Sequence, residues 1–134
     1  MKVVIDTNVL VSGLLTRDGV CGQIIQLAYQ KLLSWQIDMR ILDEYQDVLR
    51  RPKFSMAPDD VSEAVDTIVE CGEFVTASPL NIALPDRSDL PFLEVAYASG
   101  AVLVTGNTRH FPKRLCKDVL VLTPRQFLES LAQD

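Results

Sequence analysis

The sequence has little of what marks disulfide-rich, zinc-binding or membrane-spanning proteins. It has only three cysteines, Cys21, Cys71 and Cys116, without a C-x-x-C pair, so we expect neither a disulfide framework nor a zinc site. No apolar run approaches the roughly 20 residues that span a bilayer. Lys2 is followed by only three apolar residues before Asp6, which is too few for a signal peptide. We therefore expect a cytoplasmic protein without membrane contact.

An excess of positive charge is also missing. The net charge of −5 argues against a general nucleic-acid coating protein, which is usually basic. It does not exclude an enzyme whose acidic site holds cations and whose substrate groove is only locally basic. Two basic clusters suit either such a groove or an ordinary solvated surface: Arg50–Lys53, and Arg109 with His110, Lys113, Arg114 and Lys117.

The length of 134 residues suits a single domain, residues 1–134, and the chain shows neither a repeat nor a linker. Short apolar runs predict strands at Lys2–Asp6, Ser34–Asp38, Glu73–Ala77, Ala101–Thr105 and Val119–Leu122. Helical periodicity covers Asn8–Leu15, Val20–Leu33, Ile41–Arg50, Asp59–Glu70, Asp89–Ser99 and Pro124–Leu131. This alternation predicts an α/β fold with a largely parallel sheet that helices cover on both faces.

The first apolar run, Val3–Ile5, ends on an acid. The run is typical of a buried parallel strand, and Asn8 is predicted to be the N-cap of the next helix. Asp6 would then lie at the carboxyl end of a strand, where open α/β sheets place their chemistry.

A second acid lies on an apolar helix face. Glu44 follows Ile41 by three residues and precedes Val48 by four, so it shares the stripe that faces the sheet. An unpaired carboxylate there would cost free energy or would have to be protonated. The alternative is that Glu44 lies at the edge of the stripe and reaches solvent.

A third acid lies near a helix start. Pro91 is tolerated only in the first helical turn, which places Asp89 at the beginning of that helix and on its inward stripe. The helix dipole alone would also favour an acid there. Asp86 belongs to the preceding turn.

The buried strand Val102–Val104 leads into Thr105-Gly106-Asn107, which turn chemistry alone also explains. Taken together, these segments predict that Asp6, Glu44, Asp89 and Asn107 converge. Three carboxylates in one pocket repel each other, and a divalent cation removes that repulsion. Oxygen ligands suit Mg²⁺ or Mn²⁺, and such a site can activate water against a phosphate.

Four segments, residues 4–14, 41–54, 86–96 and 104–111, resemble in order the motifs of the PIN-domain family. That family is the metal-dependent ribonuclease fold of many prokaryotic toxin–antitoxin toxins. The resemblance implies a three-layer α/β/α sandwich with about five mostly parallel strands. It also implies Mg²⁺- or Mn²⁺-dependent cleavage of RNA, frequent dimerisation and neutralisation by a small antitoxin. Where many relatives have a fourth Asp, this chain has Asn107, which would hold a second ion less firmly.

The residues and the resemblance together suggest roles. Asp6 and Asp89 are expected to bind the ion, and Glu44 to bind through water or to position the attacking water. The supporting residues are Thr7, Asn8, Thr105, Asp86 and the outer-shell ligand Asn107. Arg109, Lys113 and Arg114 are expected to contact RNA phosphates. The single histidine, His110, is interpreted as a surface residue of a basic loop.

Two other interpretations use the same residues. A non-catalytic PIN-like module that binds RNA or protein would explain Asn107 and the acidic net charge. A phospho-acceptor signalling domain would need a second acid beside Asp6, where this chain has Thr7 and Asn8. The apolar pattern of Val20–Leu33 could serve a homodimer, although core packing explains it better.

Overall fold

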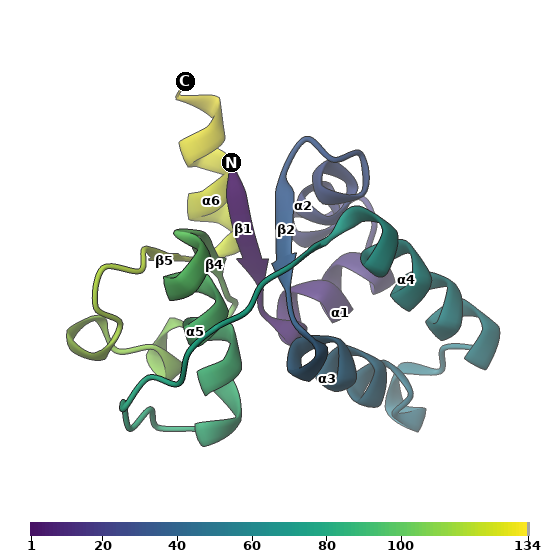
Figure 1. Ribbon diagram of the computed structural model, residues 1–134. Coiled ribbons are helices and arrows are strands. Elements are labelled where there is room, and N and C mark those ends of the chain that lie inside the picture. The colour runs from purple at the N-terminus through teal and green to yellow at the C-terminus, as the bar shows by residue number, and fades with distance from the viewer. Residues whose placement is uncertain (134) are drawn as a thin grey trace.

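The computed structural model describes residues 1–133, and its sheet contains five parallel strands in the order β3-β2-β1-β4-β5 (Figure 1). The strands are β1 (Lys2–Ile5), β2 (Ser34–Ile37), β3 (Glu73–Phe74), β4 (Val102–Val104) and β5 (Val121–Leu122). The α-helices are α1 (Thr7–Leu15), α2 (Val20–Tyr29), α3 (Met39–Leu49), α4 (Pro58–Cys71), α5 (Leu90–Ser99) and α6 (Pro124–Ala132). Four 3-10 helices complete the fold: η1 (Pro52–Phe54), η2 (Arg87–Asp89), η3 (Thr108–His110) and η4 (Lys113–Leu115). This parallel sheet flanked by helices confirms the predicted α/β fold.

Strand β1 is the centre of the sheet. Val3 pairs in register with Trp35 of β2 on one side and with Val102 of β4 on the other. Val3, Val4 and Ile5 are completely buried, as their apolar run predicts. The strand order changes direction between β1 and β4, and open α/β sheets bind ligands in the crevice outside the carboxyl ends of the strands at such a point.

The helices bury their apolar side chains in one continuous core. Helix α5 packs against β1, β2 and β4, while α1 and α2 pack against each other and α2 also contacts α4 and α6. Leu10, Ile24, Tyr45, Phe92 and Phe127 are among the buried side chains that these helices contribute. Within residues 1–133, no helix combines the length and the apolar character that crossing a bilayer requires.

Several elements are shorter than their apolar patterns predict. The helix expected over Val20–Leu33 ends at Tyr29, because Lys31 adopts a left-handed backbone with φ of 60° that a helix cannot contain. The strands expected at Glu73–Ala77 and Val119–Leu122 keep two residues each. Both are edge strands that pair with a single neighbour.

The start of α1 differs from the prediction. The expected N-cap at Asn8 is wrong, because the helix begins at Thr7 and Asp6 is the N-cap. The Asp6 carboxylate accepts a hydrogen bond of 2.8 Å from the backbone N–H of Thr7. Aspartate caps a helix as well as asparagine does, so the acid that ends the strand also begins the helix.

A long connection after β3 crosses in front of β2 and β1 before it reaches η2 (Figure 1). Leu84 of this segment is buried in the core. The backbone N–H of Leu80 donates a hydrogen bond of 2.7 Å to Oε2 of Glu94 in α5. The crossing segment therefore delivers Asp86 and Asp89 to the same sheet edge as Asp6.

Candidate functional site

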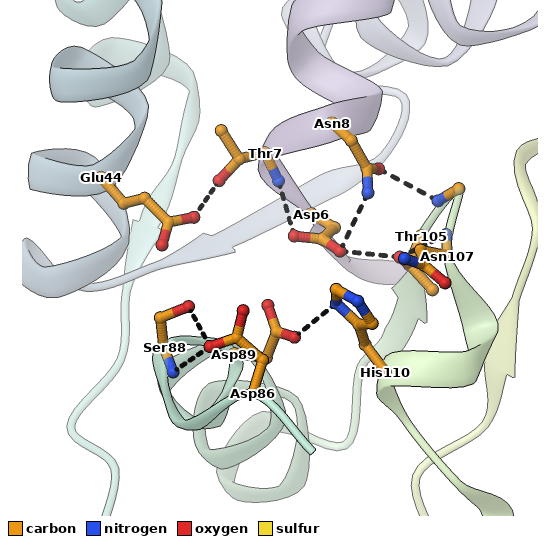
Figure 2. A network of polar contacts seen from close by, with 11 residues as sticks. Asp6, Thr7, Asn8, Glu44, Asp86, Ser88, Asp89, Thr105, Asn107 and His110 are labelled. Atoms are coloured by element: carbon orange, nitrogen blue, oxygen red, sulfur yellow. Dashed lines mark hydrogen bonds and ion pairs between the residues drawn. The ribbon is translucent and has the colours of Figure 1, made fainter. Parts of the chain in front are cut away.

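A pocket of about 500 Å³ opens where β1 and α1 meet α3, η2 and η3. The predicted site residues that line it are Asp6, Thr7, Asn8, Glu44, Asp86 and Asp89. Figure 2 shows the carboxylates of Asp6, Asp86 and Asp89 turned toward a common space, with Glu44 at its side. Residues from distant parts of the sequence therefore meet at the carboxyl ends of the parallel strands, where the sequence predicts the site.

Asp6 is buried and firmly oriented. Its Oδ1 accepts the N–H of Thr7, and its Oδ2 accepts the hydroxyl of Thr105 at 2.7 Å. Burial raises the pKa of Asp6 above the usual range of an aspartate, although both hydrogen bonds oppose the shift. A positively charged partner would offset this desolvation cost and favour the charged carboxylate.

Asn8 and Thr105 tie α1 to the turn after β4. Asn8 Oδ1 accepts the backbone N–H of Gly106 at 3.0 Å, and its Nδ2 lies 3.4 Å from Asp6 Oδ2. A Cβ atom at Gly106 would lie 3.3 Å from Asn8 Oδ1, so the glycine permits this close approach. Asn8 therefore ties the start of α1 to the turn after β4 instead of capping the helix.

Glu44 takes an intermediate position between the two sequence alternatives. It is half-buried in α3, and one of its carboxylate oxygens accepts a hydrogen bond from the Thr7 hydroxyl. Burial raises the pKa of Glu44, and the negative charge of Asp6 raises it further. The carboxylate thus lies at the edge of the apolar stripe and faces the pocket.

Asp86 and Asp89 occupy opposite ends of η2. The exposed Asp86 caps η2, and its Oδ1 accepts both the backbone N–H and the hydroxyl of Ser88, which lower its pKa. Asp89 is 7% exposed, and burial together with the charge of Asp6 raises its pKa to about 6. Asp89 Oδ2 has no hydrogen-bond partner among the described residues.

His110 is a pocket residue that sequence reasoning missed. Its Nδ1 lies 2.9 Å from Asp89 Oδ2, which is an ion-pair distance. This buried oxygen has no other polar partner among the described residues. The surface interpretation overlooked this contact, because nothing local in the sequence shows that a side chain of η3 reaches Asp89 of η2. The signal available was the position of His110 shortly after the end of a buried strand.

The predicted RNA contacts do not line the pocket. Arg109, Lys113 and Arg114 are exposed elsewhere, whereas Arg51 and Lys53 from the other basic cluster lie at the pocket. Asn107 is also outside the lining, and its backbone N–H donates to Thr105 at 3.0 Å. The ligand role of Asn107 stays a prediction.

The chemistry of the donors fits a divalent cation. Asp86, Asp89 and His110 each offer one ligand atom, and these three atoms lie within 4.8 Å of one another. A buried carboxylate oxygen without a hydrogen-bond donor is costly unless a cation or another donor satisfies it. The acids gathered beside Asp6 also repel one another, and a cation would relieve that repulsion. The pocket is therefore a candidate metal centre.

Comparison with known proteins agrees with the architecture. A family model described as PIN domain matches residues 2–109. An uncharacterized protein of Methanocaldococcus jannaschii is 28% identical over 141 aligned positions, covering 96% of this chain and 90% of that protein. The crystal structure of VapBC2 from Rickettsia felis bound to a DNA fragment from their promoter is similar in fold, with a TM-score of 0.61 and 18% identity over 92% of this chain and 98% of that chain. PAE2754 from Pyrobaculum aerophilum has a TM-score of 0.63 and 15% identity over 99% of this chain and 90% of that one.

Proposed function

Because this chain belongs to the PIN-domain family, we propose that it is a metal-dependent ribonuclease that hydrolyses RNA phosphodiester bonds with Mg²⁺ or Mn²⁺. The observation that carries the proposal is the acidic pocket, in which the buried Asp89 Oδ2 has no polar partner among the described residues besides the His110 imidazole and lies near the desolvated Asp6. A bound cation would favour the charged form of these carboxylates and offset their desolvation. Hydrolysis of a phosphodiester is the reaction that a hard cation in an open acidic pocket serves best.

Asp6 and Asp89 are the proposed ligands. Thr105 and the Thr7 N–H hold the Asp6 carboxylate in one orientation, so this side chain loses little conformational entropy when a cation binds. When bound, a divalent ion would lower the pKa of a water molecule and neutralise charge on the scissile phosphate. Asn107 and Thr105 remain proposed as weaker, outer contacts to water or phosphate.

Glu44 is proposed to orient the attacking water. The Thr7 hydroxyl occupies one of its carboxylate oxygens and leaves the other free to accept a proton from water. The raised pKa of Glu44 makes it a better proton acceptor than an exposed glutamate.

Phosphate binding falls to the basic residues. Arg51 and Lys53 line the pocket and can pair with phosphate oxygens of RNA beside the acids. Arg109, Lys113 and Arg114 remain proposed contacts for RNA that extends beyond the pocket.

The proposed biological context is the toxin of a toxin–antitoxin pair. This proposal rests on the resemblance of the four motifs to PIN-domain toxins and on the similarity in fold to VapBC2 of Rickettsia felis, whose crystal structure contains a DNA fragment from their promoter. By the same analogy, we propose that residues 1–134 act as one domain, that a cognate antitoxin protein blocks the pocket, and that the chain forms a homodimer.

The test is RNA cleavage by the Asp6→Asn variant. With Mn²⁺ present and a mixture of single-stranded and structured RNAs, the native chain should cut RNA and Asp6→Asn should lose at least about 100-fold of that activity. Asp47→Asn in α3, an exposed acid outside the pocket, is the matched control and should cut normally. Undiminished cleavage by Asp6→Asn would remove Asp6 from the mechanism.

A second candidate, a PIN-like module that binds RNA or protein without cutting, is favoured by Asn107 in place of a fourth acid. It predicts measurable RNA binding without turnover in Mg²⁺ or Mn²⁺. Gel-shift and cleavage assays on one RNA set, run in parallel, separate the two functions.

A further inference from the structure

We infer that His110 is a metal ligand of this site, so that Asp86, Asp89 and His110 form a mixed oxygen and nitrogen set for a divalent transition ion such as Mn²⁺. The inference rests on the metal site of the proposed function and adds Asp86 and His110 to its proposed ligands. Neither the four-acid pattern nor the sequence interpretation of His110 assigns the imidazole this role.

The first support is the geometry of the three donors. One ligand atom from each residue lies within 4.8 Å of the other two, a spacing that one cation can bridge with small side-chain shifts. The donors come from two segments, because η2 supplies both aspartates and η3 supplies the histidine. Figure 2 shows a nitrogen of the His110 imidazole directed at the Asp89 carboxylate, with Asp86 beside it.

The second support is an incomplete hydrogen-bond inventory. The Asp89 side chain is only 10% exposed, and within residues 1–133 its Oδ2 has no polar partner besides the His110 imidazole. The imidazole Nδ1 is at 2.9 Å from this oxygen. Ser88 occupies Oδ1 of Asp86, so the other Asp86 oxygen is free for a ligand. The cluster therefore has unused acceptors on both acids.

The backbone holds His110 in place. The His110 N–H donates to the Asn107 carbonyl at 3.1 Å, and the Phe111 N–H donates to the Thr108 carbonyl at 3.0 Å. Phe111 is buried at 3% exposure and anchors the end of η3 in the core. This turn carries Asn107 outside the pocket lining and His110 into it. The donor that follows β4 is thus a nitrogen rather than an acid.

A nitrogen donor changes the metal preference. Mg²⁺ and Mn²⁺ both suit carboxylate and water oxygens, but Mn²⁺, as a first-row transition ion, accepts an imidazole nitrogen more readily than Mg²⁺ does. The alternative is an ion pair between protonated His110 and Asp89 with no metal bound to the ring. The two arrangements differ in whether the imidazole nitrogen of His110 contacts the metal ion.

Pulsed electron paramagnetic resonance on the Mn²⁺-loaded full chain tests this directly. His110 is the only histidine of the chain, so protein without a histidine tag gives one assignable imidazole signal. We expect a directly bound nitrogen whose coupling changes when histidine alone is labelled with ¹⁵N. His110→Gln should abolish the coupling and weaken Mn²⁺ binding about 10-fold or more, with a smaller effect on Mg²⁺. Thr108→Ala, in the same turn but outside this pocket, should change neither.

Mn²⁺ binding without a histidine coupling would overturn the inference, and so would a failure to bind Mn²⁺. Both outcomes are separable from the proposed function through the cleavage assay on the same samples. RNA cleavage that depends on Asp6 without nitrogen coupling would refute the ligand role and leave the ribonuclease intact. Nitrogen coupling without cleavage would keep the ligand and refute the ribonuclease.

Discussion

Arg40 in α3 donates a hydrogen bond through Nη1 to Oε1 of Glu94 in α5, at 2.6 Å. Glu94 is buried, and its second oxygen accepts the backbone N–H of Leu80. One carboxylate thus joins the helix that carries Glu44, the helix that follows Asp89 and the segment that crosses between them. Although it lies outside the pocket, Glu94 holds together α3, α5 and the crossing segment, which carry or adjoin the candidate ligands.

Glu94→Ala should lower the free energy of unfolding by about 2–3 kcal/mol, because it leaves the Leu80 N–H without its acceptor and removes one of the two carboxylates, Glu94 and Asp38, that pair with Arg40. Urea unfolding of the metal-free protein measures this. Glu129→Ala makes the same change on the exposed face of α6 and should stay within about 0.5 kcal/mol of the native chain. Equal losses for the two variants would mean that the Glu94 contacts contribute nothing specific.

Thr105→Val should weaken Mn²⁺ binding about 10-fold, because it removes the hydroxyl that orients Asp6 while it keeps the buried shape. Thr105→Ser keeps the hydroxyl and should bind nearly as the native chain does. Titration calorimetry on both variants gives the comparison. If Thr105→Val binds Mn²⁺ normally, Asp6 does not need this hydrogen bond to serve as a ligand.

Tyr45→Phe should lower the free energy of unfolding by about 1–2 kcal/mol. The fully buried Tyr45 hydroxyl donates to the Ile5 carbonyl and accepts the Trp35 indole N–H, so it pins α3 to the end of β1. Tyr97→Phe, the same change at an exposed ring, is the control. A loss no greater than that of Tyr97→Phe would show that neither buried partner depends on the hydroxyl.

Local chemistry made part of the site predictable from sequence. An apolar β-branched run that stops on Asp6 and a proline that fixes a helix start near Asp89 each constrain a residue through its immediate neighbours. Because parallel strands end at the same edge of a sheet, these short-range signals were enough to bring Asp6 and Asp89 to one pocket. The helical stripe placed Glu44 beside them.

The remaining parts depend on how connections fold, which neighbouring residues do not specify. His110 reaches Asp89 only because the connection after β4 brings η3 close to η2, and Arg51 reaches the pocket only through the turn that follows α3. Asn8 looked like a cap, yet Asp6 caps the helix and Asn8 binds Gly106 across the site. Each of these contacts joins segments whose relation is set by tertiary packing rather than by periodicity.

The stability of the metal-free protein should fall as the pH rises through about 6. Burial raises the pKa of Asp89 from 3.8 to about 6, so the folded chain holds a proton that the unfolded chain releases at lower pH. The stability that the protonated Asp89 contributes to the folded chain is fully present below pH 3.8 and is lost as the pH rises through about 6. Asp6 and Glu44, whose pKa values burial also raises, act in the same direction.

Urea unfolding in a chelator at about pH 5 and about pH 7.5 measures this fall. Asp89→Asn removes the titrating carboxyl and should make the fall clearly smaller, although Asp6 and Glu44 still contribute. Asp47→Asn, on the exposed face of α3, should leave it unchanged. Mn²⁺ should reverse the trend, because a cation binds the ionised carboxylates and its affinity increases as protons leave them. An unchanged fall in Asp89→Asn would mean that other groups carry the pH dependence, and the buried Asp89 oxygen would then have a partner in solution.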